Sequence, residues 1–146
     1  MKKRRTTPIR PLSLFQKSVS PDDLLLDPSN PRLAGLHLGI DDQEGILSVL
    51  WKERAVNEVV DSIAANGYWP HEVLFATEES GRLVVIEGNR RLAAVKLLRS
   101  ADLCKKVGAV GIPSLTAAEI KAKKLEELPV YECPRDQVWD FIGFKH

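Results

Sequence analysis

The feature that most constrains the fold is an apolar run that stops at a glycine and continues as a helix. Residues 83–86, Leu-Val-Val-Ile, form a short run rich in β-branched side chains, which is typical of a buried strand. Glu87, Gly88 and Asn89 interrupt this run. Apolar residues then recur at helical spacing, at positions 94, 97, 98 and 101. The sequence therefore predicts a strand, a glycine turn and a helix, with Asn89 as the N-cap of that helix.

Two arginines stand where a helix least favours them. Arg90 and Arg91 occupy the first turn of the predicted helix, where peptide dipoles already present partial positive charge and each cation costs roughly 0.3–1 kcal/mol. Backbone N–H groups, a glycine that permits close approach and two guanidinium groups converge there. This combination is typical of an anion site, and a phosphate chain fits it best. Two solvated arginines after an ordinary turn are the alternative, and the spacing alone leaves both open.

Composition is that of an ordinary globular domain. The 146 residues suffice for one core, and 44% of them are hydrophobic. No run approaches the roughly 18 apolar residues of a membrane span, and the basic start lacks the apolar stretch of a signal peptide. We therefore expect a cytoplasmic protein with no membrane partner and with Cys104 and Cys133 reduced. The histidines and cysteines lack the spacing of metal ligands, so no metal site is predicted.

Charge and periodicity divide the chain into three parts. Residues 1–19 contain basic side chains and two prolines, with no acidic residue before Asp22, and are predicted to be a flexible basic arm. This arm either contacts nucleic acid or is simply solvated. Residues 20–135 hold the periodic segments and form the predicted domain. Residues 136–146 begin a helix without a stop signal, so we expect it to lead into a further C-terminal region.

Other elements follow from local patterns. Acidic residues at 41–44 precede a first helix, and a second helix with apolar positions 56, 59, 60 and 63 stops at Asn66-Gly67. Residues 73–76 are predicted to pair with residues 83–86 in a hairpin. Residues 105–113 are expected to form a linker. The last elements predicted are a helix from Thr116 to about Lys124, with Glu119 completing a capping box, and a strand at 128–132.

Four segments, taken in order, resemble the N-terminal domain of the ParB/sulfiredoxin superfamily, also described as a ParB-like nuclease domain. They are 27–32 (Asp-Pro-Ser-Asn-Pro-Arg), 60–70 (Val-Asp-Ser-Ile-Ala-Ala-Asn-Gly-Tyr-Trp-Pro), 87–94 (Glu-Gly-Asn-Arg-Arg-Leu-Ala-Ala) and 128–130 (Leu-Pro-Val). The resemblance implies an α+β fold, with a small mixed sheet and helices packed around it. It also implies a nucleotide at the glycine–arginine turn, which is CTP in ParB proteins and ATP in sulfiredoxins. The implied cofactor is thus an NTP, either CTP or ATP, with Mg²⁺.

The resemblance also assigns roles to individual residues. The turn would bind the phosphates, the loop from Gly67 to Pro70 would lie near the base, and Arg32 would close over the site. The residues expected at the nucleotide are Gly88, Asn89, Arg90, Arg91, Arg32, Gly67 and Pro70. The catalytic candidates are Glu87 and Arg90. Glu87 either holds Mg²⁺ through water or pairs with an arginine, and the pairing is the preferred interpretation.

The chain departs from the family's patterns at several points. Asn89 stands where sulfiredoxins have their catalytic cysteine, so sulfinic acid reduction is not expected. The Glu-Asn-x-x-Arg motif of ParB partition proteins does not follow residue 133, and the segment 99–127 is longer than the usual link. These differences favour a divergent relative that acts in plasmid, phage or DNA-defence biology.

Three functions stay open. The first is an NTP-binding module of a DNA-associated protein, which either only binds the nucleotide or also hydrolyses it, as a CTPase does. The second is a ParB-like DNA nuclease that uses the same arginines on the scissile phosphate, although such cleavage usually requires clustered carboxylates and a metal. The third is a non-catalytic DNA- or protein-interaction domain. The expected partners are a nucleotide, DNA (through the basic arm or a C-terminal region) and a second copy of the chain in a homodimer.

Overall fold

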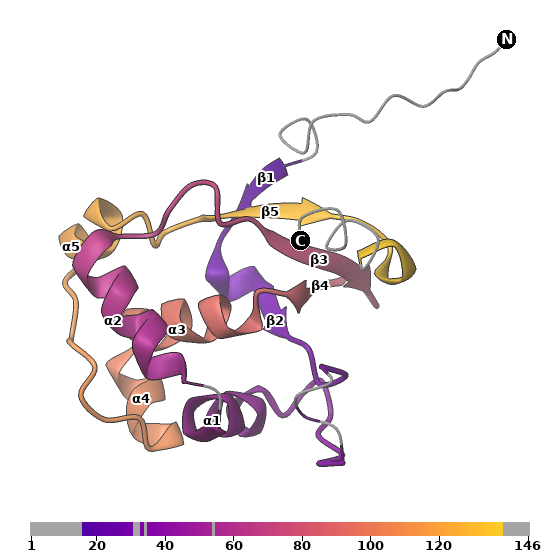
Figure 1. Ribbon diagram of the computed structural model, residues 1–146, viewed down its shortest axis with the longest axis horizontal. Coiled ribbons are helices and arrows are strands. Elements are labelled where there is room, and N and C mark those ends of the chain that lie inside the picture. The colour runs from indigo at the N-terminus through magenta and orange to yellow at the C-terminus, as the bar shows by residue number, and fades with distance from the viewer. Residues whose placement is uncertain (1–15, 31–32, 34, 54, 139–146) are drawn as a thin grey trace, which may run out of the picture.

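A five-stranded mixed sheet is the centre of the fold (Figure 1). The computed structural model describes residues 16–30, 33, 35–53 and 55–138 of the chain. Two antiparallel pairs (β3 with β4, and β1 with β5) and two parallel pairs (β3 with β5, and β2 with β4) make up the sheet. The predicted hairpin and mixed sheet are therefore confirmed. In spatial order the strands are β1 (Gln16–Val19), β5 (Leu128–Glu132), β3 (Leu74–Glu79), β4 (Arg82–Glu87) and β2 (Leu24–Leu26).

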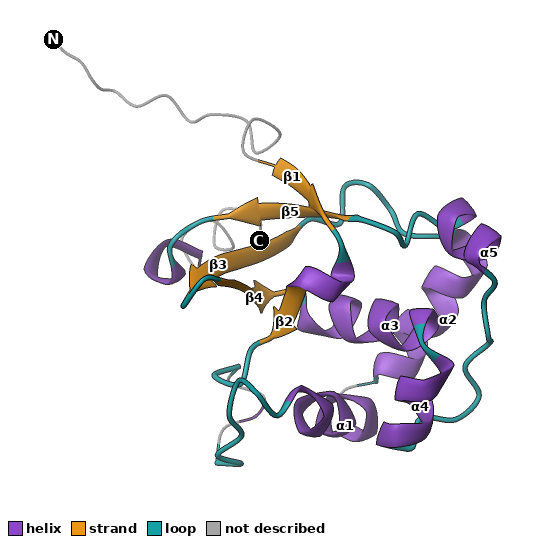
Figure 2. Ribbon diagram, turned by 180° about the vertical axis from the view of Figure 1, so that it is seen from behind, coloured by secondary structure: helices purple, strands orange, loops and turns teal. Residues whose placement is uncertain are grey.

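Helices α1 to α5 gather on one side of the sheet (Figure 2). They are α1 (Gln43–Glu53), α2 (Val56–Asn66), α3 (Asn89–Arg99), α4 (Ala101–Val107) and α5 (Ala117–Ala122), with a short 3-10 turn at Pro21–Asp23. Residues 105–107, which were predicted to lie in a linker, complete α4 instead. The reason is Ser100, which ends α3 and whose hydroxyl accepts the Leu103 N–H to start α4. In the described part of the chain, every helix is too short or too polar to cross a membrane.

Two predicted helix boundaries are confirmed. The second helix, α2, ends at Asn66, and Gly67 follows with φ +76°, donating its N–H to the Ile63 carbonyl. At the start of α5, Thr116 and Glu119 form the predicted capping box. The α2 boundary begins the loop that leads into β3.

Two apolar clusters pack on the two faces of the sheet. The larger one joins Leu74, Ala76 and Val85 to the apolar faces of α1–α4, and the apolar side chains at 92–95 and 97–98 of α3 are all buried within it. Each fully buried leucine there contributes about 2 kcal/mol. The smaller cluster covers the other face with residues from β3, β4 and the end of the described chain: Val73, Phe75, Val84, Ile86, Tyr131, Cys133 and Val138. Helix α3 is therefore the most deeply packed helix, and its start is firmly placed.

The two ends of the domain differ from the prediction. Residues 16–19, predicted to belong to the flexible arm, form β1 and pair with β5. The side chains of β1 are mostly exposed, so backbone hydrogen bonds hold the strand and no apolar pattern reveals it. Residues 135–138 are helical, close to the predicted start at 136. Residues 139–146, where the sequence predicts that the helix continues, and residues 1–15 of the predicted arm lie outside the described residues.

Candidate functional site

The turn between β4 and α3 has a backbone that only glycine fits. Gly88 has φ +104°, a left-handed conformation that other residues rarely adopt. A Cβ atom at this position would lie 2.4 Å from Leu74 Cδ2 and 2.9 Å from Arg91 Nη2. Gly88 is also the N-cap residue, and α3 begins without a side-chain cap. The N–H groups of a first helical turn have no partner within the helix, so this end of α3 is suited to an anion.

Asn89 does not cap the helix, which corrects the prediction. It is the first residue of α3 and only 4% exposed. Its Oδ1 accepts the Asp27 N–H at 3.1 Å, and its Nδ2 donates to the Val85 carbonyl at 2.9 Å. Because both ends of the amide have a buried backbone partner, Asn89 ties the loop that follows β2 to β4 and to the start of α3.

Arg91 folds back across the glycine turn. Its guanidinium forms an ion pair with Glu72, and its Nη2 lies 3.5 Å from the Val73 carbonyl. The Arg91 side chain is 20% exposed and that of Glu72 is 42% exposed, so the pair lies at the surface. The contact joins the first turn of α3 to the loop between α2 and β3.

Glu87 and Arg90, the two catalytic candidates, flank the turn. In the described part of the chain, Glu87 Oε2 is buried and has no hydrogen-bond partner. The preferred pairing of Glu87 with an arginine is therefore wrong for Arg91, which pairs with Glu72 instead. Arg90 is exposed in the first turn of α3, next to Arg91. Among the described residues, no group of three or more His, Cys, Asp or Glu side chains could hold a metal ion.

The loop after α2 is anchored near its start and presents an aromatic side chain. Tyr68 donates its N–H to the Lys123 carbonyl at 2.9 Å and its hydroxyl to the Glu72 carbonyl at 2.6 Å, and burial raises the pKa of Tyr68 to about 12. Trp69 is 53% exposed, and its ring meets the His71 ring edge-on at 5.4 Å. An exposed tryptophan on an anchored loop is a common ligand contact. Its place between Gly67 and Pro70 was the sequence signal, although Trp69 itself was not among the predicted site residues.

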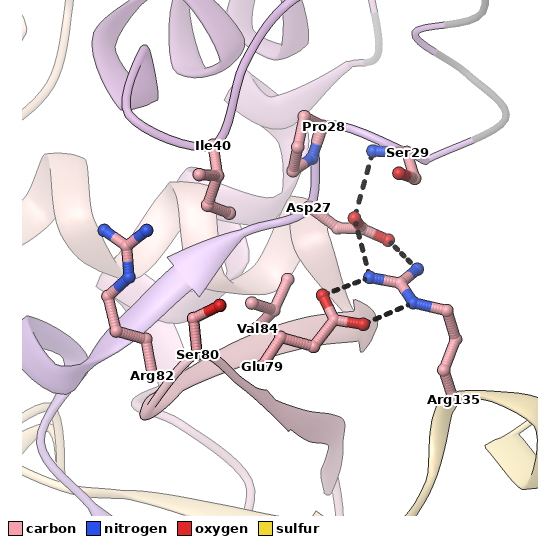
Figure 3. A pocket seen from close by; sticks show the side chains of 9 residues that line it. All are labelled: Asp27, Pro28, Ser29, Ile40, Glu79, Ser80, Arg82, Val84 and Arg135. Atoms are coloured by element: carbon pink, nitrogen blue, oxygen red, sulfur yellow. Dashed lines mark hydrogen bonds and ion pairs between the residues drawn. The ribbon is translucent and has the colours of Figure 1, made fainter.

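A second cluster of charges, which sequence reasoning missed, lies at the ends of β2 and β3 (Figure 3). Asp27 is only 2% exposed, and its carboxylate accepts a hydrogen bond from Arg135 Nη1 at 3.0 Å and one from the Ser29 N–H at 3.0 Å. Arg135 also donates to Glu79 through Nε and Nη2, both at 2.8 Å. These hydrogen bonds lower the pKa of Glu79 and raise that of Arg135. Asp27 and Arg135 are 108 residues apart, so no local pattern links them.

This cluster borders a small cavity of about 140 Å³. Figure 3 shows the side chain of Arg82 on the opposite side of the cavity from Arg135. Arg82 also forms an ion pair with Asp41 at 3.0 Å. The remaining lining residues are Pro28, Ser29, Ile40, Ser80 and Val84. The cavity is distinct from the β4–α3 turn, to which it is linked through Asp27 and Asn89.

Four of the predicted site residues are consecutive in the sequence and lie together in the structure. Gly88, Asn89, Arg90 and Arg91 share the β4–α3 turn, and the Glu72–Arg91 ion pair joins this turn to the end of the loop between α2 and β3. Gly67, at the start of that loop, lies against the backbone of Lys123 instead. The proline-containing segment also starts there, because Asp27 bonds to Asn89. Arg32 lies outside the described residues, so its expected position over the site stays a prediction.

Known proteins give no independent indication of what this site binds. Comparisons of the chain with protein families, with curated proteins and with solved structures found no match. The resemblance to the ParB/sulfiredoxin superfamily therefore stays a prediction.

Proposed function

We propose that this chain binds the phosphates of a nucleoside triphosphate at the β4–α3 turn, as the nucleotide-binding module of a DNA-associated protein. One observation supports the proposal most: the Arg91 guanidinium lies over Gly88 at the start of a helix that has no side-chain cap. Association with DNA and formation of a homodimer are proposed on the resemblance alone.

Charge at the turn favours an anionic ligand. Arg90 and Arg91 add two cations to the positive end of the helix dipole, where each costs roughly 0.3–1 kcal/mol without a counter-charge. Glu72 supplies a carboxylate to Arg91, and this carboxylate occupies a position that a phosphate oxygen could take. Arginine binds phosphate oxygens through paired, charge-assisted hydrogen bonds, which are about twice as strong as neutral ones. A phosphate chain would therefore compete well with Glu72 for Arg91.

The neighbouring loop provides a surface for the base. Trp69 is 53% exposed and belongs to the loop that the Glu72–Arg91 pair holds at the turn. Stacking of a base on an aromatic side chain is worth about 1–3 kcal/mol. A nucleotide would thus place its phosphates on the β4–α3 turn and its base on the exposed ring of Trp69.

A Mg²⁺ ion fits the site as a companion of the phosphates. Magnesium usually keeps several waters and is bound through one or two carboxylates together with substrate phosphates. Glu87 Oε2 is buried without a partner in the described part of the chain and would accept a hydrogen bond from a water on the ion. The ion would neutralise phosphate charge, while the arginines and the backbone N–H groups fix the phosphate positions. The nuclease alternative is less favoured, since the described residues lack the carboxylate cluster that metal-dependent cleavage usually needs.

A thermal-shift experiment with variants tests the proposal. The wild-type chain is heated with ATP, CTP, GTP or UTP, each with Mg²⁺, and one nucleotide is expected to raise the melting temperature. A ligand at 100 times its Kd stabilises by about 2.7 kcal/mol, which is a shift of several degrees. Arg91→Ala should abolish the shift and Arg90→Ala should reduce it. Arg82→Ala removes an exposed arginine from the other end of β4 and should leave the shift intact.

Two other results would overturn the proposal in favour of the alternatives. Metal-dependent nicking of plasmid DNA without any NTP requirement would indicate the nuclease. No shift with any nucleotide, together with DNA binding that weakens steeply as salt is added, would indicate the interaction domain.

A further inference from the structure

A continuous series of contacts joins the end of the described chain to the β4–α3 turn. Arg135 lies three residues after β5 and holds the Asp27 carboxylate. The backbone N–H of the same Asp27 donates to Asn89 Oδ1 at 3.1 Å, and Asn89 Nδ2 donates to the Val85 carbonyl at 2.9 Å. The Arg135–Asp27 and Asp27–Asn89 contacts join residues that are 108 and 62 positions apart in the sequence, and the second of them reaches the first residue of α3.

Burial makes the Arg135 contact strong. Asp27 is 2% exposed, and a buried carboxylate without a compensating cation is strongly unfavourable. Arg135 itself has little freedom, because its other edge donates two hydrogen bonds of 2.8 Å to Glu79 on β3. Figure 3 shows the guanidinium between the two carboxylates, with dashed contacts to both. The position of Asp27 is therefore set relative to the sheet by Arg135.

The start of α3 is joined to this position through the buried side chain of Asn89. Its side chain has two hydrogen bonds in the structure, and one of them comes from the Asp27 N–H. The backbone N–H groups proposed to bind phosphate belong to the same helical turn. A displacement of about 1 Å at a binding group lowers ligand affinity or rate considerably. A shift of Asp27 would therefore reach the phosphate site through Asn89.

We propose that Arg135 is a positioning residue for the phosphate turn. It keeps Asp27 in place and, through Asn89, keeps the first turn of α3 in the geometry that binds the anion. Arg135 does not contact the ligand, since Asp27 and Asn89 stand between them. This inference depends on the proposed function, which supplies the ligand whose affinity reports the geometry.

Calorimetric titration of the full chain with the stabilising nucleotide and Mg²⁺ tests the role. Arg135→Met should weaken nucleotide binding about tenfold. Arg135→Lys keeps the positive charge but loses the planar guanidinium group that bonds to both carboxylates, and it should weaken binding about threefold. Arg82→Ala removes the other arginine of the same cavity and should bind like wild type. Calorimetry measures the affinity of the folded fraction, so a role in stability alone would leave Kd unchanged.

The double variant Asp27→Asn with Arg135→Met shows whether Arg135 acts through Asp27. It removes both charges, so no buried charge is left uncompensated, while residue 27 keeps its backbone N–H for Asn89. We expect it to be more stable than Arg135→Met alone, and to bind within about threefold of wild type because the shared hydrogen bond survives. Binding as weak as that of Arg135→Met would overturn the inference.

Amide hydrogen exchange gives a readout that needs no ligand. The Asp27 N–H should exchange slowly in wild type and at least tenfold faster in Arg135→Met, whereas the Tyr68 N–H, bonded to the Lys123 carbonyl, should be unaffected. If wild type binds a nucleotide and Arg135→Met binds equally well, only the positioning role is overturned. If wild type binds no nucleotide, the proposed function and the positioning role are overturned together.

Discussion

Two arginine–carboxylate contacts in this protein use the same chemistry in different surroundings. Arg91 and Glu72 form a surface pair, with side chains 20% and 42% exposed. Arg135, whose side chain is 36% exposed, instead reaches Asp27, which is 2% exposed, and also pairs with Glu79, which is 43% exposed. The two contacts therefore differ in the burial of the carboxylate and not in that of the arginine. An exposed pair is worth about 0–1 kcal/mol, whereas breaking a buried pair costs about 3–5 kcal/mol. Under the proposed function, Arg91 therefore exchanges Glu72 for the ligand, whereas Arg135 keeps Asp27 as its partner.

Asn89 lies between these two contacts and belongs to both regions. Its side chain bonds to Asp27 of the buried cluster, and its backbone starts the helix that Arg91 belongs to. We infer that the Arg135–Asp27 contact is a fixed support of the turn, whereas Arg91 is the group that binds the ligand in place of Glu72. The following predictions are ordered by the size of the change expected in stability.

Removing the buried cation should have the largest effect. Arg135→Met leaves the Asp27 carboxylate buried without its cation, and we expect the free energy of unfolding to fall by about 3 kcal/mol. Urea denaturation measures the change. The double variant with Asp27→Asn should recover most of the lost stability. If Arg135→Met alone lowers the free energy of unfolding by less than about 1 kcal/mol, the Arg135–Asp27 contact is no stronger than an exposed pair such as Arg91–Glu72.

Substitution of Gly88 should be the next largest effect. Gly88→Ala combines φ +104° with a Cβ only 2.4 Å from Leu74 Cδ2, so we expect a loss of about 2–3 kcal/mol. Gly81→Ala is the matched control, because Gly81 has φ +77° with nothing within 4 Å of the added Cβ, and it should cost about 1 kcal/mol. Equal losses in thermal melts of the two variants would argue against the close packing of Leu74 and Arg91 on the turn.

Acidic pH should weaken the contact between Arg135 and Glu79, which lies at the exposed edge of the charged cluster. Hydrogen bonds from Arg135 lower the pKa of Glu79 from 4.5, so the contact adds stability above that pH and loses it as the pH falls through the lower folded-state pKa. The difference in unfolding free energy between wild type and Glu79→Gln should therefore be constant near neutral pH and shrink below about pH 4.5. Denaturation curves from pH 7 to pH 3 measure it. A difference that does not change with pH would contradict the assigned contact.

Changing the surface pair should affect stability least and binding most visibly. Glu72→Gln removes the charge that competes for Arg91, so we expect stability to change by less than about 0.5 kcal/mol and nucleotide affinity to rise a few-fold. Glu44→Gln removes an exposed carboxylate paired with Lys106 on another part of the surface and should change neither. Weaker binding by Glu72→Gln would mean that Glu72 supports the site instead of competing with the ligand.

Local patterns predicted the elements of the fold well. The capping box at Thr116, the glycine stop at Gly67 and the strand–turn–helix around Gly88 all follow from neighbouring residues, and the structure has each of them. The break at Ser100 was missed because the apolar spacing of α3 continues past it. The edge strand β1 was missed because backbone pairing, without buried side chains, holds it.

The contacts that define the two arginine sites could not be predicted from local patterns. An asparagine at a helix start fits an N-cap equally well, and only the Asp27 backbone, 62 residues away, makes Asn89 a buried bridge. Likewise, Arg91 meets Glu72 and Arg135 meets Asp27 only because the sheet order brings their segments together. Such partners are set by tertiary packing, and a single sequence contains no local signal for them.

The most direct measurement is a titration of the ¹⁵N-labelled chain with the stabilising nucleotide and Mg²⁺, followed by backbone amide chemical shifts. The largest shifts should fall on Gly88, Asn89, Arg90 and Arg91, with a smaller change at the Trp69 indole. They should be absent in Arg91→Ala. Shifts confined to the cavity between Arg82 and Arg135, or no saturable shifts at the turn, would contradict the account.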